Sequence, residues 1–325
     1  MRILRNLEDL PAPLKGGAVA VGNFDGVHKG HRAVIGEAGR IARGAGAPWL
    51  VLTFEPHPRS VFSPNTAPFR ITPPPVKARL IAQLGVDGLI ELPFDLEFSR
   101  QSAETFIENV IVRGLGAQHV VSGYDFVFGH GRKGNCELLL HKGRELGFGF
   151  TSLAAHGDEE GGAFSATRVR TLLREGKPRE AAEILGRDFE IEGEVEGGAQ
   201  RGRTIGFPTA NVQLGPYIRP ATGVYAVRVV SVGDERPRWH GGVANFGSRP
   251  TFDGNGELLE VHLFDFDGDL YGKRLRVALI EHLRPEIKFA GIDALRTQIA
   301  ADAETARRIL KKAAVLPLTK QRALP

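Results

Sequence analysis

The feature that most constrains the fold of this 325-residue sequence is a change of pattern near residue 189. Before residue 125, apolar segments (AVAVGNF, PWLVLTF, DGLIELPF, HVVSG) alternate with segments of helical pattern over 30–45, 76–84 and 102–113. This alternation predicts βαβ units and a doubly wound parallel sheet with helices on both faces. After residue 189, short β-rich segments separated by Gly, Pro and Asp turns predict a small antiparallel barrel or sandwich. A helical tail is expected over roughly 291–312.

Chain length also favours two domains. A chain of 325 residues exceeds the size at which a single hydrophobic core usually stops growing. The charged segment REGKPREAAEILGRD between the two patterns indicates a helix followed by a connector. We therefore expect domains over residues 1–182 and 183–325.

Composition restricts the compartment and the partners. The single cysteine, Cys136, excludes a disulfide framework and favours a reducing compartment, so we expect a cytoplasmic protein. An apolar leader segment and an apolar run of membrane-spanning length are both absent from the sequence, so neither export nor membrane insertion is expected. The net charge of +4 is scattered, which argues against nucleic acid as a partner. The oligomeric state is left open.

The stretch GNFDGVHKGH, residues 22–31, places two histidines three positions apart at the start of an expected helix. Such a pair suits phosphate handling or metal binding. A catalytic zinc site would need further ligands, and the nearest candidate, His57, has no Cys or HxxxH partner at metal spacing. Backbone amides and the helix dipole favour an anion at this position, so phosphate is the preferred ligand. Local capping or packing by His28 and His31 is the alternative.

Glycines surround this pair in a pattern that fits a phosphate-binding turn. Gly22 ends an apolar strand, Gly26 permits a tight turn, and Gly30 allows the backbone to approach a ligand. Another glycine set, Gly129, Gly131 and Gly134, spells GxGxxG. The preceding strand lies late in the expected sheet, so a dinucleotide-binding interpretation is disfavoured.

The second half contains oxygen-bearing side chains at alternating positions. Thr209 and Asn211 lie two apart in GFPTAN, and Glu260 should share a sheet face with His262 in LLEVHLF. A plain Gly/Pro turn and an exposed strand charge are the alternatives for these two segments. The acidic stretch DFDGDLYGKRLR does not fit a calcium loop, because Leu270 and Arg276 occupy the positions that require Gly and Glu.

These motifs resemble known enzymes. GNFDGVHKGH, together with TFEPHP, GYDFVFGHGRKG and FSATRVR, resembles bacterial FAD synthetase of the HxGH nucleotidyltransferase type. RGRTIGFPTANV, GVYAV, GVANFGSRPTF and LEVHLFDFDGDLYG resemble riboflavin kinase. Together they match the bifunctional bacterial riboflavin kinase/FAD synthetase family over about residues 18–303.

The resemblance implies two reactions. The C-terminal half, a small antiparallel β-barrel with a helical tail, would phosphorylate riboflavin to FMN. The N-terminal half would transfer AMP from ATP to FMN and release pyrophosphate, giving FAD. ATP is the co-substrate of both steps, and Mg²⁺ is the implied cofactor. A chain with an active kinase half alone, or a silent flavin-binding regulator, is the alternative.

The resemblance also implies roles for individual residues. Glu260 would be the general base of the kinase, and His28 and His31 would act on the phosphates of the adenylyl transfer. Thr209 and Asn211 would hold Mg²⁺. ATP and phosphate contacts are implied for Gly22, Asn23, Asp25, Gly30, Ser165, Thr167, Arg168, Arg170, Gly202, Arg203 and Gly206. Without the resemblance, SATRVR indicates a helix start with a solvated basic face. Flavin contacts are implied for Phe54, His57, Asp125 and Phe126, and core packing is the alternative for Phe54.

The sequence departs from the family pattern at four positions. Tyr124 stands where a small or acidic residue is expected, and Ala166 stands where a serine is expected. Ala199 and Gln200 replace an expected Asp-Gly pair. These departures concern contacts of the two ATP sites and leave the motifs themselves intact.

Overall fold

The computed structural model describes residues 1–155, 157, 162–196, 207–234, 237–251 and 254–313. By their internal contacts, the described residues form two compact units. The first unit comprises residues 1–67 and 72–165, and the second comprises residues 68–71 and 166–313. The helical segment before residue 182 thus packs with the second unit. The boundary expected at residue 182 concerns where one activity ends and the other begins. Packing does not test this, so the boundary stays a prediction.

The first unit is built on a six-stranded sheet in the order β1-β4-β3-β2-β5-β6, and its strand pairs are parallel. The strands are β1 (Arg2–Leu4), β2 (Ala18–Val21), β3 (Trp49–Glu55), β4 (Gly88–Pro93), β5 (His119–Gly123) and β6 (Gly149–Leu153). The central strand β2 is buried along its whole length, as expected of a parallel sheet covered on both faces. The predicted doubly wound parallel sheet is therefore confirmed.

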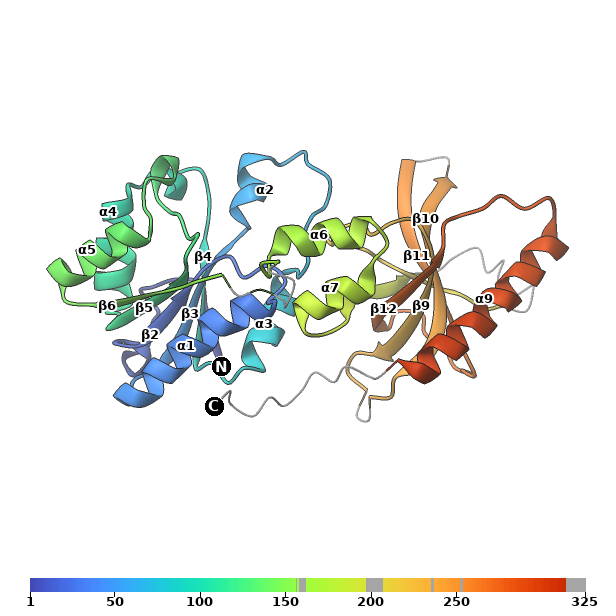
Figure 1. Cartoon of the computed structure of the whole chain (residues 1–325), viewed down its shortest axis with the longest axis horizontal. Coiled ribbons are helices and arrows are strands. Elements are labelled where there is room, and N and C mark those ends of the chain that lie inside the picture. Colours follow the sequence, from blue (N-terminus) through green and yellow to red (C-terminus); the bar gives the residue numbers. More distant parts are fainter. Residues whose placement is uncertain (156, 158–161, 197–206, 235–236, 252–253, 314–325) are drawn as a thin grey trace. The chain divides into compact units, whose positions relative to one another are not determined.

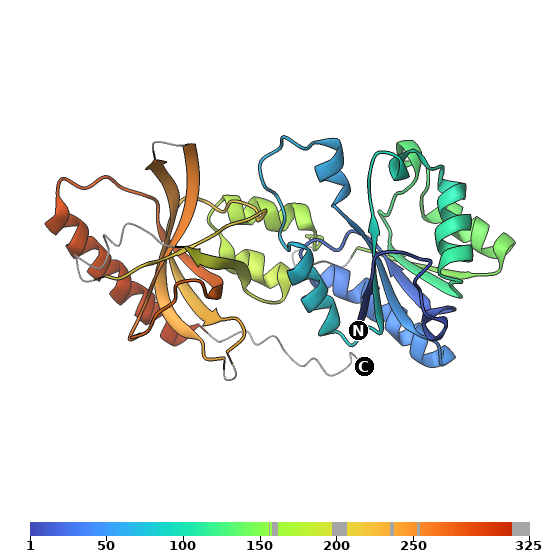
Figure 2. The ribbon, with the colours of Figure 1, turned by 180° about the vertical axis from the view of Figure 1, so that it is seen from behind.

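Helices cover both faces of this sheet (Figures 1 and 2). On one face, α1 (Lys29–Ala45) packs its buried Ile35 and Ala38 against β2, β3 and β5. On the other face, Val19 and Val21 share a core with Phe106 and Ile111. The remaining helices of the unit are α2 (Pro58–Phe62), α3 (Pro74–Ala82), α4 (Ala103–Phe106), which continues into the π-helix η3 (Ile107–Gly114), and α5 (Cys136–Leu146); short 3-10 turns are η1 (Ala12–Leu14), η2 (Phe98–Arg100) and η4 (His130–Arg132).

The second unit is a closed barrel in the order β10-β11-β8-β7-β12-β9, and its strand pairs are antiparallel. The strands are β7 (Phe189–Glu196), β8 (Ala210–Val212), β9 (Gly223–Ser231), β10 (His240–Thr251), β11 (Gly254–Leu263) and β12 (Arg274–Arg284). Side chains alternate between the two faces of each strand, and Phe246, Leu259 and Val261, which are fully buried, point to the inside of the barrel. Of the two predicted forms, barrel or sandwich, the structure has the barrel.

Among the described residues of the second unit, the helices α7 (Pro178–Leu185) and α9 (Ile292–Lys312) contact the barrel, and α6 (Ala166–Arg174) packs on α7. The helices α6 and α7 precede the barrel in the chain, and α7 contacts β7 and β12. The long helix α9 lies along β9, β10 and β12 (Figure 2), where Ala306 joins a core with Val224 and Phe264. The predicted helical tail is confirmed within one residue at its start.

Candidate functional site

The first candidate site lies where the strand order of the parallel sheet reverses. From β2 the chain moves through β3 to β4 on one side, and β5 and β6 lie on the other side. Ligands of doubly wound sheets bind outside the carboxyl ends of the strands at such a point. The loop after β2, the exit of β3 and the exit of β5 therefore meet at one edge. They carry His28 and His31, His57, and Asp125, respectively.

The loop after β2 has an unusual backbone. Gly26 has a φ of 94°, as the predicted tight turn requires, and Phe24 and Val27 also have positive φ values of 50° and 41°. A left-handed conformation is unfavourable for a bulky or β-branched residue and persists only where surrounding contacts impose it. The loop is thus held in a strained conformation directly before α1.

The two histidines of this loop lie against each other. Their ring centroids are 3.5 Å apart with planes 22° from parallel, and His28 is almost fully buried. His28 Nδ1 accepts a hydrogen bond from the His31 backbone N–H at 3.3 Å and so caps α1. The local capping that the sequence left open is therefore present. Because Nδ1 accepts, the neutral ring carries its proton on Nε2, which can donate to an anion at the helix N-terminus.

Gly30 allows close packing at the start of α1. A Cβ atom added there would lie 3.2 Å from His28 Nδ1 and 3.3 Å from the carbonyl oxygen of Phe164. Phe164 also lies beneath Lys29, whose Nζ is 5.3 Å from the ring centroid. The structure thus brings the beginning of the FSATRVR motif, with Ser165 next in the chain, to the histidine pair.

The rest of that motif belongs to the second unit. Thr167, Arg168 and Arg170 lie on α6. Arg170 Nε donates to the Phe69 carbonyl oxygen at 2.9 Å, and its guanidinium lies 5.5 Å from the centroid of the Phe69 ring. Arg170 therefore has a structural contact in its own unit.

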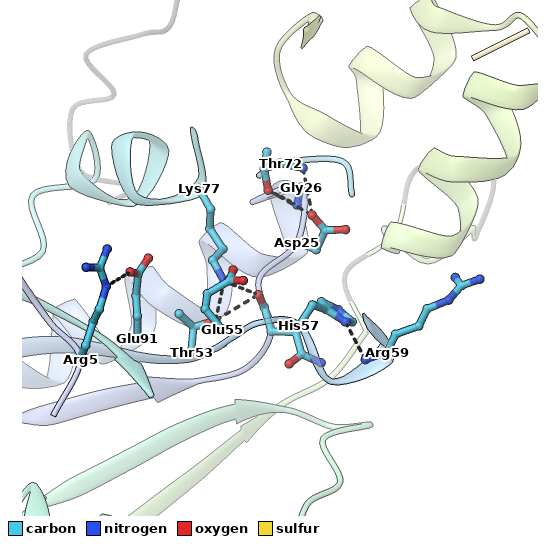
Figure 3. Close-up of polar contacts among 11 residues, drawn as sticks. Arg5, Asp25, Gly26, Thr53, Glu55, His57, Arg59, Thr72, Lys77 and Glu91 are labelled. Carbon is cyan, nitrogen blue, oxygen red and sulfur yellow. Dashed lines mark hydrogen bonds and ion pairs between the residues drawn. The ribbon is translucent and has the colours of Figure 1, made fainter. Parts of the chain in front are cut away.

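Asp25 is anchored to a residue that the sequence analysis missed. Its Oδ1 accepts from the backbone N–H of Thr72 at 2.9 Å and from the Thr72 hydroxyl at 3.3 Å (Figure 3). Thr72 Oγ1 in turn accepts from the Gly26 N–H at 2.8 Å. A threonine before three prolines gives no local signal for this contact, because its partners are 46 and 47 positions away in sequence.

The candidate flavin residues have different environments. Phe54 is buried with its ring centroid 6.0 Å from those of Phe94 and Phe98, so it packs in the core. His57 caps α2 through Nδ1, which accepts from the Arg59 N–H at 3.1 Å. After β5, Asp125 is exposed and Phe126 is half-buried, with its ring stacked on Phe128. The exposed Tyr124 precedes them.

The GxGxxG segment forms a turn instead of a helix start. Gly129 and Gly131 have positive φ values, and Gly134 pairs with Phe128 in an isolated antiparallel bridge. The short 3-10 turn His130–Arg132 lies within the segment, and α5 begins only at Cys136. This geometry is consistent with the sequence analysis, which disfavoured a dinucleotide-binding loop.

The second candidate site is a row of polar side chains across the barrel. Glu260 on β11 lies directly opposite Asn211 on β8 and Asn245 on β10. Their inner-face neighbours are apolar, so the three residues share the other face of the strands. Asn211 is mostly buried, and no hydrogen-bond donor among the described residues reaches its Oδ1. An oxygen in this state is available to a cation or a ligand donor.

Thr209, two positions before Asn211 in the chain, lines a pocket of the barrel unit. The walls of the pocket include Val261, Phe266, Asp269 and Tyr271. His262 shares the face of Glu260, as its spacing predicts, and its Nδ1 donates to the Pro208 carbonyl oxygen at 2.8 Å. This bond ties β11 to the residue before Thr209. Gly202, Arg203 and Gly206, as well as Ala199 and Gln200, lie outside the described residues.

The oxygen donors of this region fit a hard cation better than a soft one. Asn211 Oδ1, the Thr209 hydroxyl and the Glu260 carboxylate are the donor types that Mg²⁺ accepts. Within the described ranges, no group of three His, Cys, Asp or Glu side chains could hold a metal. A magnesium ion here would therefore need phosphate oxygens and water to complete its coordination.

Comparison with known proteins separates the chain into the same two halves. Residues 11–168 match the family model of FAD synthetase, and residues 185–310 match that of riboflavin kinase. Proteins named bifunctional riboflavin kinase/FMN adenylyltransferase from Escherichia coli strain K12 and from Pseudomonas fluorescens are each 42% identical to the chain. The alignments cover 94% and 95% of this chain and 97% and 98% of those relatives.

A solved structure has a similar fold over nearly the whole chain. It is described as a macrolide-efflux protein from Streptococcus pneumoniae, and it superposes with a TM-score of 0.83 at 32% identity. The match covers 94% of this chain and 98% of that one. In the part of the present chain that the structure describes, no helix has the length and apolar character needed to cross a membrane.

Proposed function

Because the chain belongs to the family of bifunctional riboflavin kinase/FMN adenylyltransferases, it phosphorylates riboflavin to FMN and adenylylates FMN to FAD, and we propose which residues carry each reaction. Both domain families match, which leaves a kinase with a silent first half, or a flavin-binding regulator, without support. Riboflavin, FMN and ATP are the substrates that these two reactions imply.

The adenylyl transfer is assigned to the loop after β2 and the start of α1. The FMN phosphate attacks the α-phosphorus of ATP and pyrophosphate leaves, so the protein must supply position and charge rather than a nucleophile. His28 and His31 would donate to phosphate oxygens and stabilise the developing charge. The contacts to ATP are assigned to Gly22, Asn23, Asp25, Gly30 and Ser165. The same role for Thr167, Arg168 and Arg170 rests on the resemblance of their motif to the family, and these three residues pack with the second unit.

The flavin of this half is assigned to the exits of β3 and β5. His57 and the exposed Asp125 offer polar groups, and the half-buried Phe126 offers a ring face. Phe54 would form the floor of this site, because its burial in the aromatic core fixes it in place. The exposed Tyr124 adds a ring that the family pattern does not have.

The kinase reaction is assigned to the polar row of the barrel. Glu260 would take the proton from the ribityl 5′-hydroxyl as that oxygen attacks the γ-phosphorus, the bond from this phosphorus to the bridging oxygen breaks, and ADP leaves. Thr209 and Asn211 would hold Mg²⁺, which when bound neutralises charge on the ATP phosphates. Asn211 Oδ1, which no donor of the described residues reaches, supports this assignment. Gly202, Arg203 and Gly206 would form the phosphate loop.

We assign FMN adenylylation to residues 1–182 and riboflavin phosphorylation to residues 183–325.

The composition of the chain also indicates its compartment and its partners. The single cysteine suits a reducing cytoplasm. The scattered net charge of +4 argues against nucleic acid as a partner. We propose no membrane partner, because the sequence has no apolar run of spanning length.

The observation that carries these assignments is that the structure contains two polar clusters, the stacked histidine pair at the start of α1 and the row of Asn211, Glu260 and Asn245 on the barrel, each suited to one reaction. The test is to incubate the protein with riboflavin, ATP and Mg²⁺ and to follow FMN and FAD by chromatography, with a parallel reaction started from FMN. We expect FMN first and FAD later. Accumulation of FMN without FAD in both reactions would contradict the adenylyltransferase assignment, and formation of neither product would contradict both.

A further inference from the structure

Lys77 on α3 is a fully buried lysine in the first unit, in a position where few lysines are found. Its Nζ lies 2.6 Å from Glu55 Oε1 and 2.9 Å from Thr53 Oγ1. It also donates to the carbonyl oxygen of Asn23 at 3.3 Å. Figure 3 shows the Lys77 side chain with those of Glu55 and Thr53. One ammonium group thus contacts a carboxylate, a hydroxyl and a backbone carbonyl, with no water-exposed surface.

These three partners belong to the two segments that carry the proposed adenylyltransferase site. Asn23 lies in the loop before His28, and Thr53 and Glu55 end β3, two residues before His57. The Thr53 hydroxyl, which accepts from Lys77, donates in turn to the Asn23 carbonyl oxygen at 3.1 Å. That carbonyl therefore receives hydrogen bonds from both Lys77 and Thr53.

The Asn23 carbonyl is a sensitive point of the loop. Its peptide unit leads directly into Phe24, which has a φ of 50°. A residue in this conformation returns to a more favourable one unless its neighbouring peptides are held. Lys77 and Thr53 hold the peptide before Phe24, and Thr72 holds Asp25 and Gly26 on the other side.

A second carboxyl group, that of Glu91, interacts electrostatically with the Lys77 ammonium. Glu91 on β4 is buried opposite Thr53. Burial raises the pKa of Glu91, and the positive charge of Lys77 acts in the opposite direction. Lys77 is therefore the central cation of a buried polar cluster next to the site.

We propose that Lys77 is a positioning residue for FMN adenylylation, which holds the loop that presents His28 and His31 at a defined distance from the exit of β3. It touches no substrate and acts through the Asn23 carbonyl and Glu55. The inference rests on the proposed role of the histidine pair.

The test compares Lys77→Met, Glu55→Gln and the double variant with the unchanged chain. In each, kcat and KM for ATP in FMN adenylylation are measured together with riboflavin phosphorylation by the same sample and with thermal unfolding. We expect Lys77→Met to lower kcat/KM for adenylylation about 10- to 100-fold, as small misplacements of reacting groups do. Phosphorylation of riboflavin should not change, because the barrel is a separate unit.

The double variant separates positioning from charge balance. Removing both charges should recover most of the thermal stability that Lys77→Met loses, but adenylylation should stay low, because the Asn23 carbonyl still lacks its ammonium donor. Recovery of adenylylation together with stability would overturn the proposal. Lys142→Met is the matched control, since it removes an ion pair with the half-exposed Glu145 and should leave both activities unchanged.

Thr53→Val provides a test that keeps both charges of the ion pair, although it also removes one hydrogen-bond acceptor of Lys77 Nζ. It removes the hydroxyl that donates to the Asn23 carbonyl while keeping shape, and should lower adenylylation without altering kinase activity. Normal adenylylation in both Lys77→Met and Thr53→Val would overturn the proposal. If His28→Ala with His31→Ala also kept adenylylation, the proposed function would fail and this inference with it. If the histidine variant alone were inactive, only the inference would fail.

Discussion

The two units present their polar groups in different ways. In the parallel α/β unit, the candidate residues lie in loops after the strands, and some of the backbone there is left-handed. In the barrel, Asn211, Glu260 and Asn245 lie on strands whose hydrogen-bonded register places them side by side. A loop has no ladder of its own to fix its conformation, whereas a strand in a closed barrel has one on each side.

This difference indicates where each half is vulnerable. The loop after β2 depends on buried anchors from elsewhere in the sequence, among them Thr72 and Lys77. The polar row of the barrel depends on register, because a slip of one residue would turn Glu260 to the apolar face. The two activities should therefore respond to different substitutions, and each can be removed without the other.

The largest effect is expected for Glu260→Ala. Loss of the proposed base should lower riboflavin phosphorylation by about 10²- to 10⁴-fold, the usual contribution of general base catalysis. FMN adenylylation by the same sample should be unchanged. Glu257→Gln on the same strand, where the carboxylate pairs with Arg219 at the surface, is the control that should keep both activities. Loss of both activities in folded Glu260→Ala would contradict the independence of the two sites.

The reverse pattern is expected for His28→Ala combined with His31→Ala. Adenylylation should fall by about 10²- to 10³-fold, as after loss of a group that stabilises developing charge, and riboflavin phosphorylation should persist. His28→Asn distinguishes capping from catalysis, because Asn is a good N-cap but has no imidazole. We expect His28→Asn to keep the unfolding temperature and to lose adenylylation. Normal adenylylation in this variant would show that His28 only caps α1 and takes no part in the reaction.

An intermediate effect on stability is expected for Asp302→Ala in the barrel unit. Asp302 is mostly buried on α9 and accepts from the Arg284 guanidinium at 2.7 Å and from Gln298 at 2.9 Å. Its removal leaves Arg284 without this carboxylate, which should lower the free energy of unfolding by about 3 kcal/mol. On heating, kinase activity should then be lost before adenylylation. Simultaneous loss of the two activities would show that the units unfold together.

The smallest effect is expected for Asp188→Asn at the start of the barrel. Burial raises the pKa of Asp188 to about 6, although nearby Arg228 acts in the opposite direction. The folded protein therefore holds this proton more tightly than the unfolded chain. The contribution of Asp188 to the free energy of unfolding is therefore most favourable below about pH 4, where the carboxyl group is neutral in both states. This contribution is lost as the pH rises towards 6, because the buried group must then ionise. Chemical denaturation should show Asp188→Asn to be more stable than the unchanged chain at pH 7 and equal to it near pH 4.

Much of this architecture can be predicted because its signals are local. Strand and helix periodicities are properties of neighbouring residues, so the parallel sheet and the end helix follow directly from them. The helix expected over 291–312 is found at Ile292–Lys312. The turn at Gly26 and the histidine pair at the start of α1 also follow from adjacent residues.

The tertiary structure alone decides which distant groups meet. Lys77 lies in a segment whose pattern predicts an ordinary helix, and nothing local indicates that its ammonium is buried against Asn23, 54 positions away. The contact of Thr72 with Asp25 and the opposition of Asn211 and Glu260 are of the same kind. The sequence by itself determined the elements, their class and the chemistry of the motifs, because these depend on short-range pattern. Burial, register and the anchoring of the strained loop depend on how the elements pack, and that is a property of the whole unit.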